Sequence, residues 1–138
     1  MTDNALAKVN SYSIHENELK WFDVPLVPGA KAALLYGDPT RAGTVILRFM
    51  FPANCQTPPH RHPYDEYTTI LSGTVYYGEG EAFDSSSPQI GKAGTFAIVP
   101  ARQAHFVWTS DVPAIVQLQF EGPLQTIPVS SSDETRKS

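Results

Sequence analysis

PPHRHPYDEYTTILSG, at residues 58–73, places two histidines and an acid close together in the chain. His60 and His62 are two residues apart, and Glu66 follows four residues after His62. In an extended strand residues i and i+2 face the same side, so both imidazoles can reach one ion, whereas a helix would splay them by well over a right angle. The bend that Pro63 favours lets the carboxylate return to the same ion. The stretch therefore predicts a metal site carried on a strand.

Two alternatives to a metal site stay open at this point. One is chance, although a shuffled chain of this composition would contain the pattern in on the order of one case in a few hundred. The other places His60 and His62 on the surface of a polar loop, because Pro58, Pro59 and Pro63 surround them.

The composition indicates one soluble globular domain. The chain has 138 residues, of which 41% are hydrophobic and 11% aromatic, enough for a core of its own. A net charge of −4 without a basic stripe argues against a nucleic-acid partner. No apolar run approaches the roughly 20 residues of a membrane span, no secretion signal is recognisable, and the single Cys55 fits a reducing compartment. We therefore expect a cytoplasmic protein with no membrane or nucleic-acid partner.

Short apolar segments between turn residues predict an all-β protein. The 12 prolines and 9 glycines are spread through the chain, and the segments between them are rich in β-branched and aromatic residues. The predicted strands are 32–36, 44–51, 66–73, 74–80, 94–100, 105–110 and 114–122. Residues 17–22 fit either a short helix or a strand. Strands at this spacing favour a sandwich or a barrel, of which the jelly roll is one form.

The remaining segments set the expected domain limits. Residues 1–30 are expected to form an N-terminal strand or extension that packs on the barrel, and residues 31–128 the barrel itself. Residues 83–94 have the Ser, Pro and Gly content of a surface loop. Residues 129–138 are polar enough to predict a disordered tail.

The first motif of the cupin superfamily, Gly-x5-His-x-His-x3-Glu-x6-Gly, resembles residues 54–73. Four family positions are occupied by the family residue: His60, His62, Glu66 and Gly73. Asn54 stands in place of the leading glycine, a mild departure because asparagine tolerates a left-handed backbone.

The second cupin motif, Gly-x5-Pro-x-Gly-x2-His-x3-Asn, resembles residues 94–109. Gly94, Pro100 and His105 match it, whereas Arg102 replaces the inner glycine and Thr109 the final asparagine. Neither replaced position is a metal ligand in the motif. The resemblance runs from about Thr44 to Phe120 and is closest to the small single-domain cupins of bacteria.

This resemblance implies a jelly-roll, or double-stranded β-helix, barrel that holds one divalent transition metal. The implied ligands are His60, His62, Glu66 and His105. Three imidazoles and a carboxylate accept iron, manganese, nickel, copper or zinc and leave about two coordination positions open. Outside the motif, a lone histidine such as His105 is more often a packed residue than a ligand.

The expected function is that of a metal-dependent enzyme acting on a small organic molecule. Dioxygenase-, decarboxylase- and isomerase-like reactions all occur in the family, so the expected enzyme is an oxidoreductase or a lyase. The alternative is a non-catalytic module that binds or senses a small molecule.

Four further side chains are candidates for the substrate pocket. Gln117 and Gln119 share one face of a predicted strand, and their alternative is a solvated face. Arg48 can bind a substrate carboxylate or reach solvent, and Tyr64 is a candidate for the mouth. Outside the pocket, Cys55 is expected to be a small buried apolar residue, with thiolate ligation the less favoured alternative, and His15 a surface residue.

A homodimer is the expected oligomeric state. If His105 points inward, Val107 shares its face, while Phe106 and Trp108 face outward. Large exposed aromatic residues usually mark a partner surface. The alternative is that the N-terminal segment around Trp21 and Phe22 covers them and leaves a monomer.

Overall fold

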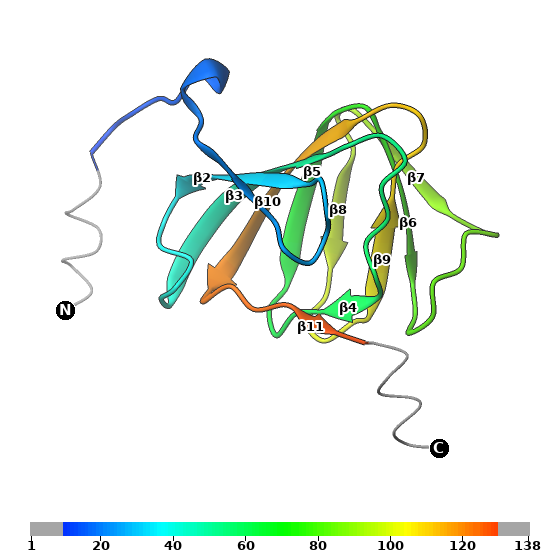
Figure 1. Ribbon diagram of the computed structural model, residues 1–138. Coiled ribbons are helices and arrows are strands. Elements are labelled where there is room, and N and C mark those ends of the chain that lie inside the picture. The colour runs from blue at the N-terminus through cyan, green and yellow to red at the C-terminus, as the bar shows by residue number, and fades with distance from the viewer. Residues whose placement is uncertain (1–9, 130–138) are drawn as a thin grey trace.

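The computed structural model describes residues 10–129, which fold into two antiparallel β-sheets (Figure 1). The six-stranded sheet has the order β1-β2-β3-β10-β5-β8 and the five-stranded sheet the order β11-β4-β9-β6-β7. The strands are β1 (Trp21–Asp23), β2 (Lys31–Tyr36), β3 (Gly43–Phe51), β4 (His60–Arg61), β5 (Glu66–Ser72), β6 (Thr74–Glu79), β7 (Gln89–Lys92), β8 (Phe96–Val99), β9 (His105–Trp108), β10 (Ala114–Gly122) and β11 (Ile127–Pro128). The predicted jelly-roll fold is confirmed.

Alternation along the long central strands builds the core between the sheets. β3 and β10 pair over their full lengths, from Gly43 opposite Gly122 to Phe51 opposite Ala114. Val45, Leu47, Phe51, Val116 and Phe120 are buried, Phe49 and Leu118 pack on the same face, and the alternate residues face the other side. The apolar strands thus supply a core that does not depend on an ion.

The chain passes from one sheet to the other at Gly73, between β5 and β6. Gly73 has a φ of +77°, and a Cβ there would lie 2.2 Å from the carbonyl oxygen of Pro113. Only glycine fits this corner. Asn54 and Arg102, which replace motif glycines, also have positive φ values of 56° and 70°, so both departures from the motif keep the left-handed backbone.

All seven predicted strands are present, and the structure adds shorter ones. β7 lies inside residues 83–94, which were predicted as a loop; that prediction is wrong for Gln89–Lys92. The four residues of β7 are too few to show alternation, and β7 is held as an edge strand by pairing with β6. Residues 17–22 are divided between a 3₁₀ turn at Glu16–Glu18 and β1.

Short strands near both ends of the described chain pair with strands of the barrel. β1 pairs with β2 and forms one edge of the six-stranded sheet. β11 pairs with β4, and Val129 is buried with its N–H donating to the carbonyl of Pro59. The predicted disordered tail otherwise lies outside the described residues. No helix within residues 10–129 is long and apolar enough to cross a membrane.

Phe106 lies on the face of β9 away from the cavity, as expected, but it is covered and not exposed to a partner. Phe106 is only 1% exposed. Its ring packs 5.0 Å from that of Phe83, which also lies 5.2 Å from the ring of Trp108. Gly78 leaves room for Phe106, because a Cβ there would come within 2.7 Å of the ring. The chain's own segment before β7 therefore covers this face, and neither the N-terminal segment nor a second copy is needed for it.

Candidate metal centre

Three histidines meet at one end of the barrel, where β4 and β11 cross it (Figure 1). His60 on β4 is the register partner of His105 on β9, and His62 follows directly after β4. One ring nitrogen from each of the three lies within 4.8 Å of the others, and all three side chains are buried. We call His60, His62 and His105 the histidine cluster.

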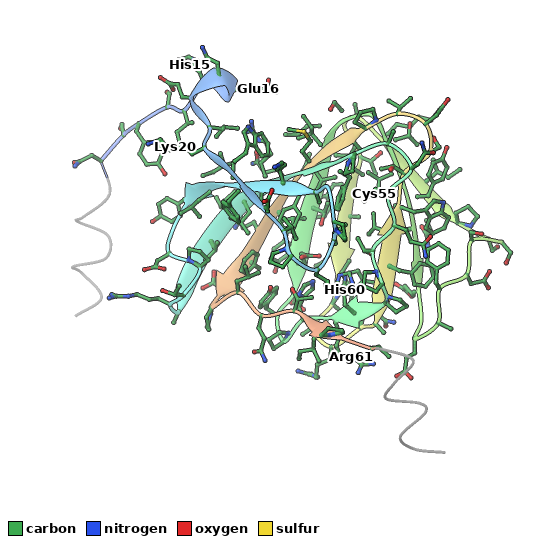
Figure 2. All side chains as sticks on the ribbon, in the orientation of Figure 1. His15, Glu16, Lys20, Cys55, His60 and Arg61 are labelled. Carbon is green, nitrogen blue, oxygen red and sulfur yellow. The ribbon has the colours of Figure 1, made fainter. Side chains whose placement is uncertain are left out.

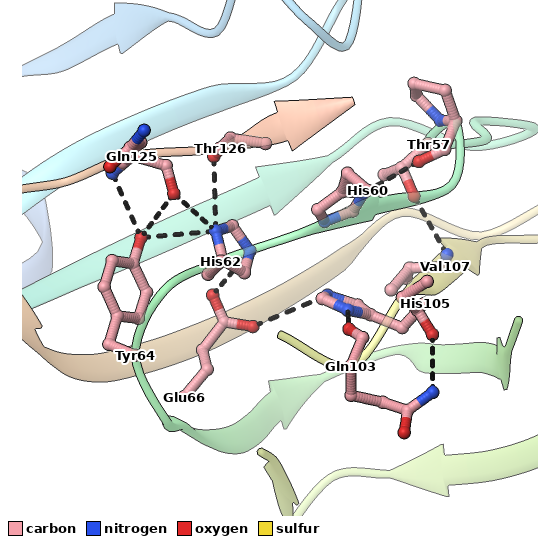
Figure 3. A network of polar contacts seen from close by, with 12 residues as sticks. Thr57, His60, His62, Tyr64, Glu66, Gln103, His105, Val107, Gln125 and Thr126 are labelled. Atoms are coloured by element: carbon pink, nitrogen blue, oxygen red, sulfur yellow. Dashed lines mark hydrogen bonds and ion pairs between the residues drawn. The ribbon is translucent and has the colours of Figure 1, made fainter. Parts of the chain in front are cut away.

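Each imidazole of the histidine cluster is held by a backbone carbonyl through its Nδ1 atom (Figure 3). The Nδ1 of His60 lies 2.7 Å from the carbonyl oxygen of Pro58, that of His62 lies 2.9 Å from Gln125, and that of His105 lies 3.0 Å from Gln103. A carbonyl oxygen only accepts, so each Nδ1 carries the proton. The Nε2 lone pairs are left for a ligand, which is the arrangement of a metal-binding imidazole.

Glu66, the first residue of β5, adds a carboxylate to the histidine cluster. Its Oε2 lies 3.4 Å from the Nε2 of His62, and its Oε1 lies 3.8 Å from the Nε2 of His105. Burial raises the pKa of Glu66 to about 7. Burial also lowers the pKa of His60 to about 4, that of His105 to about 3, and that of His62 below its usual value. The imidazoles are therefore neutral at pH 7, and these contacts are not ion pairs.

These donors fit a divalent transition metal. Three neutral imidazoles face a buried carboxylate, and within the described residues no lysine or arginine forms an ion pair with that carboxylate. A divalent cation would satisfy the Nε2 lone pairs and the carboxylate at the same time. The surface-loop alternative for His60 and His62 is wrong, because both side chains are buried and anchored.

A cavity of about 120 Å³ adjoins the centre between the two sheets. His60, Glu66 and His105 form one end of its lining. The rest is largely apolar and comes from both sheets, including Phe51, Ile70, Val75, Val107, Val116 and Leu118. The arrangement therefore places a possible metal ion at the polar end of an apolar chamber.

The assignment of Gln117, Gln119 and Arg48 to the pocket is wrong. Arg48 and Gln117 are register partners on β3 and β10, and the guanidinium donates to the Gln117 side-chain oxygen at 2.8 and 3.2 Å. Gln119 is exposed. The cavity is lined instead by their neighbours Val116 and Leu118, so the amides lie on the outer face of the sheet, as the solvated-face alternative held.

Tyr64 is buried beside His62 and does not line the cavity. Its ring stacks between those of His62 and Phe120, at 5.1 and 4.4 Å. Its hydroxyl lies 3.3 Å from the Nδ1 of His62 and donates to the carbonyl of Gln125 at 3.3 Å. Tyr64 therefore positions His62, and its assignment to the mouth is corrected.

The two residues predicted to lie outside the pocket do so. Figure 2 shows His15 on the N-terminal segment, well apart from His60, and His15 is exposed. Cys55 is buried in the apolar core cluster with Val27 and Phe51, and burial raises the pKa of its thiol. It is absent from the group of possible ligands, so it packs as a small apolar residue.

Several functional groups carry no signal in the sequence. The carbonyls of Pro58, Gln103 and Gln125 orient the imidazoles, but any residue has a carbonyl. Thr57 lines the cavity, and its hydroxyl accepts from the N–H of Val107. These contacts depend on how the loops fold back, which spacing alone does not reveal.

Similar structures share this fold at low sequence identity. The polyketide cyclase RemF from Streptomyces resistomycificus superposes with a TM-score of 0.73 at 16% identity, over 88% of this chain and 87% of that chain. KdgF from Halomonas sp. gives 0.63 at 17%, over 80% and 94%. The DMSP lyase DddQ from Ruegeria pomeroyi gives 0.62 at 20%, over 80% of this chain but 59% of its own. At these identities the likeness establishes the fold alone.

The family comparison covers the strands that carry the centre. No curated protein sequence matches the chain significantly. The profile of the Cupin domain family matches residues 47–118, which include the histidine cluster and Glu66. With more than half of its length matched and the jelly roll in place, the chain belongs to the cupin family.

Proposed function

We propose that this cupin is a metal-dependent enzyme that acts on a small organic molecule. The observation that carries the proposal is the convergence of three carbonyl-anchored imidazoles and Glu66 at the end of a largely apolar cavity. A structural metal site would need no chamber beside it, whereas the four ligands here leave about two positions of a six-coordinate ion open. Here the ligand set leaves room for a substrate atom.

The residues divide the work between holding an ion and holding a substrate. His60, His62 and His105 would bind the ion through Nε2, and Glu66 would supply the one charged donor. An ion bound there would supply Lewis-acid polarisation of a substrate oxygen. The apolar walls exclude water, which strengthens electrostatic interactions at the polar end. These nitrogen and oxygen donors accept iron, manganese, nickel, copper or zinc.

A non-catalytic binding module is the second candidate, and one observation favours it. Apart from the ligand set, Tyr77 and Glu79 are the only groups able to exchange a proton among the residues of 10–129 that line the cavity, and Glu79 is exposed. Two of the similar structures are named as a cyclase and a lyase, which supports the enzyme. A substrate screen would distinguish the two reaction classes, oxidoreductase and lyase.

The test is metal analysis of the purified chain followed by turnover assays. We expect about one divalent ion per chain after reconstitution, and turnover of a small organic substrate that stops when the ion is removed by a chelator. Oxygen uptake during turnover would identify an oxidoreductase. A chain that binds no divalent ion would overturn the proposal, and ligand binding without turnover would favour the sensing module.

We further propose that the protein is a cytoplasmic homodimer. With Phe106 buried, the support for a dimer moves to the outer face of β5 and β8, where Tyr67, Leu71 and Phe96 are 41%, 40% and 61% exposed. Exposed apolar groups of this kind usually mark a partner surface. Light scattering tests the proposal: a mass near 15.1 kDa would refute it, and Phe96→Asp should shift a dimer toward that mass.

A further inference from the structure

The size and the chemistry of the cavity walls limit which substrates can bind. The inference drawn from them rests on the proposed function. We infer that the substrate presents one oxygen group to the metal end and an uncharged, apolar body of about one ring to the rest of the cavity. Size, polarity and charge each support this.

The volume of the cavity limits the size of the ligand. The cavity of about 120 Å³ is lined by side chains of both sheets. An apolar protein cavity of about 150 Å³ is known to take up benzene. The volume here matches a five- or six-membered ring or a branched chain of similar size.

The polarity of the lining is uneven. Phe51 on β3, Ile70 on β5, Val75 on β6, and Val116 and Leu118 on β10 form apolar walls. Polar donors gather at the opposite end, with His60, Glu66 and His105. A ligand that buries polar atoms against the apolar walls would leave those atoms without hydrogen-bond partners. The oxygen group of the substrate must therefore lie at the metal end.

Charge narrows the class further. Among the described residues that line the cavity there is neither lysine nor arginine, and the charged side chains are the acids Glu66 and Glu79. Arg48 is bonded to Gln117 on the outer face, and Arg61 pairs with Glu81 at 2.9 Å. An anionic group on the body of the substrate would be desolvated against the apolar walls, where none of the described lining residues supplies a cation to pair with it. The cavity thus selects against dicarboxylates and phosphates.

A matched pair of probes tests this in the zinc-loaded protein. 4-Methylbenzoate and terephthalate offer the ion the same carboxylate and differ only in a methyl or a second carboxylate at the far end of the ring. We expect 4-methylbenzoate to bind at least about tenfold more tightly by calorimetry. Equal affinities, or tighter binding of terephthalate, would overturn the inference.

A cavity-filling variant locates the binding. Val116→Phe places a ring in the cavity, whereas Ile115→Phe makes a similar change at the next residue of β10, which does not line it. We expect the first to weaken 4-methylbenzoate at least about tenfold and the second to leave it unchanged. If circular dichroism shows Val116→Phe unfolded, Ala97→Phe on β8 replaces it. Unchanged binding in a folded cavity-filled variant would refute the inference.

Zinc content measured on the same samples separates this inference from the proposed function. If the chain binds zinc but does not prefer 4-methylbenzoate over terephthalate, only the inferred substrate class is refuted and the proposed function stands. If the chain binds neither zinc nor another divalent ion, the proposed function fails by itself, and toluene binding to the folded chain then tests the cavity. Saturable toluene binding that Val116→Phe abolishes would support the apolar chamber, and its absence would overturn it.

Discussion

Two groups of polar side chains in this barrel have opposite environments. On the outer face of the six-stranded sheet, Arg48 and Gln117 use their polar atoms on each other. Inside, His60 and His105 direct Nδ1 to backbone carbonyls, which leaves Nε2 for something else. The difference teaches that polarity within a strand is a weak sign of a site. A buried side chain that is held in a fixed orientation by one polar atom, with its other polar atom free of a protein hydrogen bond, is a strong sign.

The largest effect is expected from substitutions in the histidine cluster. We expect alanine at His60, His62 or His105 to remove most of the bound metal and to leave the barrel folded, because the apolar strands supply the core. Metal analysis and circular dichroism measure the two effects on the same sample. A triple alanine variant that keeps stoichiometric metal would exclude the proposed centre.

Glu66 should have a smaller effect on metal retention than any of the three histidines. Glu66→Gln keeps an oxygen donor and loses the charge, so we expect metal affinity to fall by about tenfold, or about 1.4 kcal/mol. Glu66→Ala removes the donor as well and should cost more. Competition with a chromogenic chelator gives these affinities, and an affinity unchanged in Glu66→Ala would exclude Glu66 as a ligand.

The buried groups also make the stability of the metal-free protein depend on pH. The pKa values of His60 and His105 fall from 6.5 to about 4 and about 3, and that of His62 also falls. Below pH 6.5 the unfolded chain binds protons that the folded chain does not, so the free energy of unfolding decreases on acidification.

Glu66 opposes this trend because its pKa rises from 4.5 to about 7, so between these values the folded chain holds a proton that the unfolded chain has lost. Three histidines outnumber one acid, and we expect a net loss of stability from pH 6.5 to 4.5. Denaturant unfolding of the metal-free protein should show a steeper loss in Glu66→Gln, which lacks the opposing proton. A variant that follows the wild-type profile would contradict the burial-driven pKa of Glu66.

The sequence predicts the inner region better than the outer one, for physical reasons. The spacing of His60, His62 and Glu66 constrains three side chains to one ion, and the strands that carry the core repeat long enough to be recognised. Alternation also shows that Gln117 and Gln119 share a face. It does not show which face is inside, because Val116 and Leu118 form an equally regular set.

Other features escape prediction because they are short or non-local. β4, β7 and β11 contain too few residues for a period to show. Their positions follow from pairing with strands that are far away in the chain. The carbonyl of Gln125 reaches His62 only because the chain returns across the barrel end after β10.

The smallest effect is expected from substitutions of Arg48 and Gln117 on the outer face of the sheet. Arg48→Met and Gln117→Leu keep the approximate size of each side chain and remove the hydrogen bonds between them. A partly exposed pair of this kind contributes about 1 kcal/mol or less, and either variant should bind metal as the wild type does. A double-mutant cycle by denaturant unfolding measures the coupling, and chelator competition measures the metal affinity. A loss of metal affinity in Arg48→Met comparable to that of a histidine variant would show that the outer face supports the metal centre. The contrast between polar atoms that bond to each other and polar atoms left for a ligand would then not hold for this barrel.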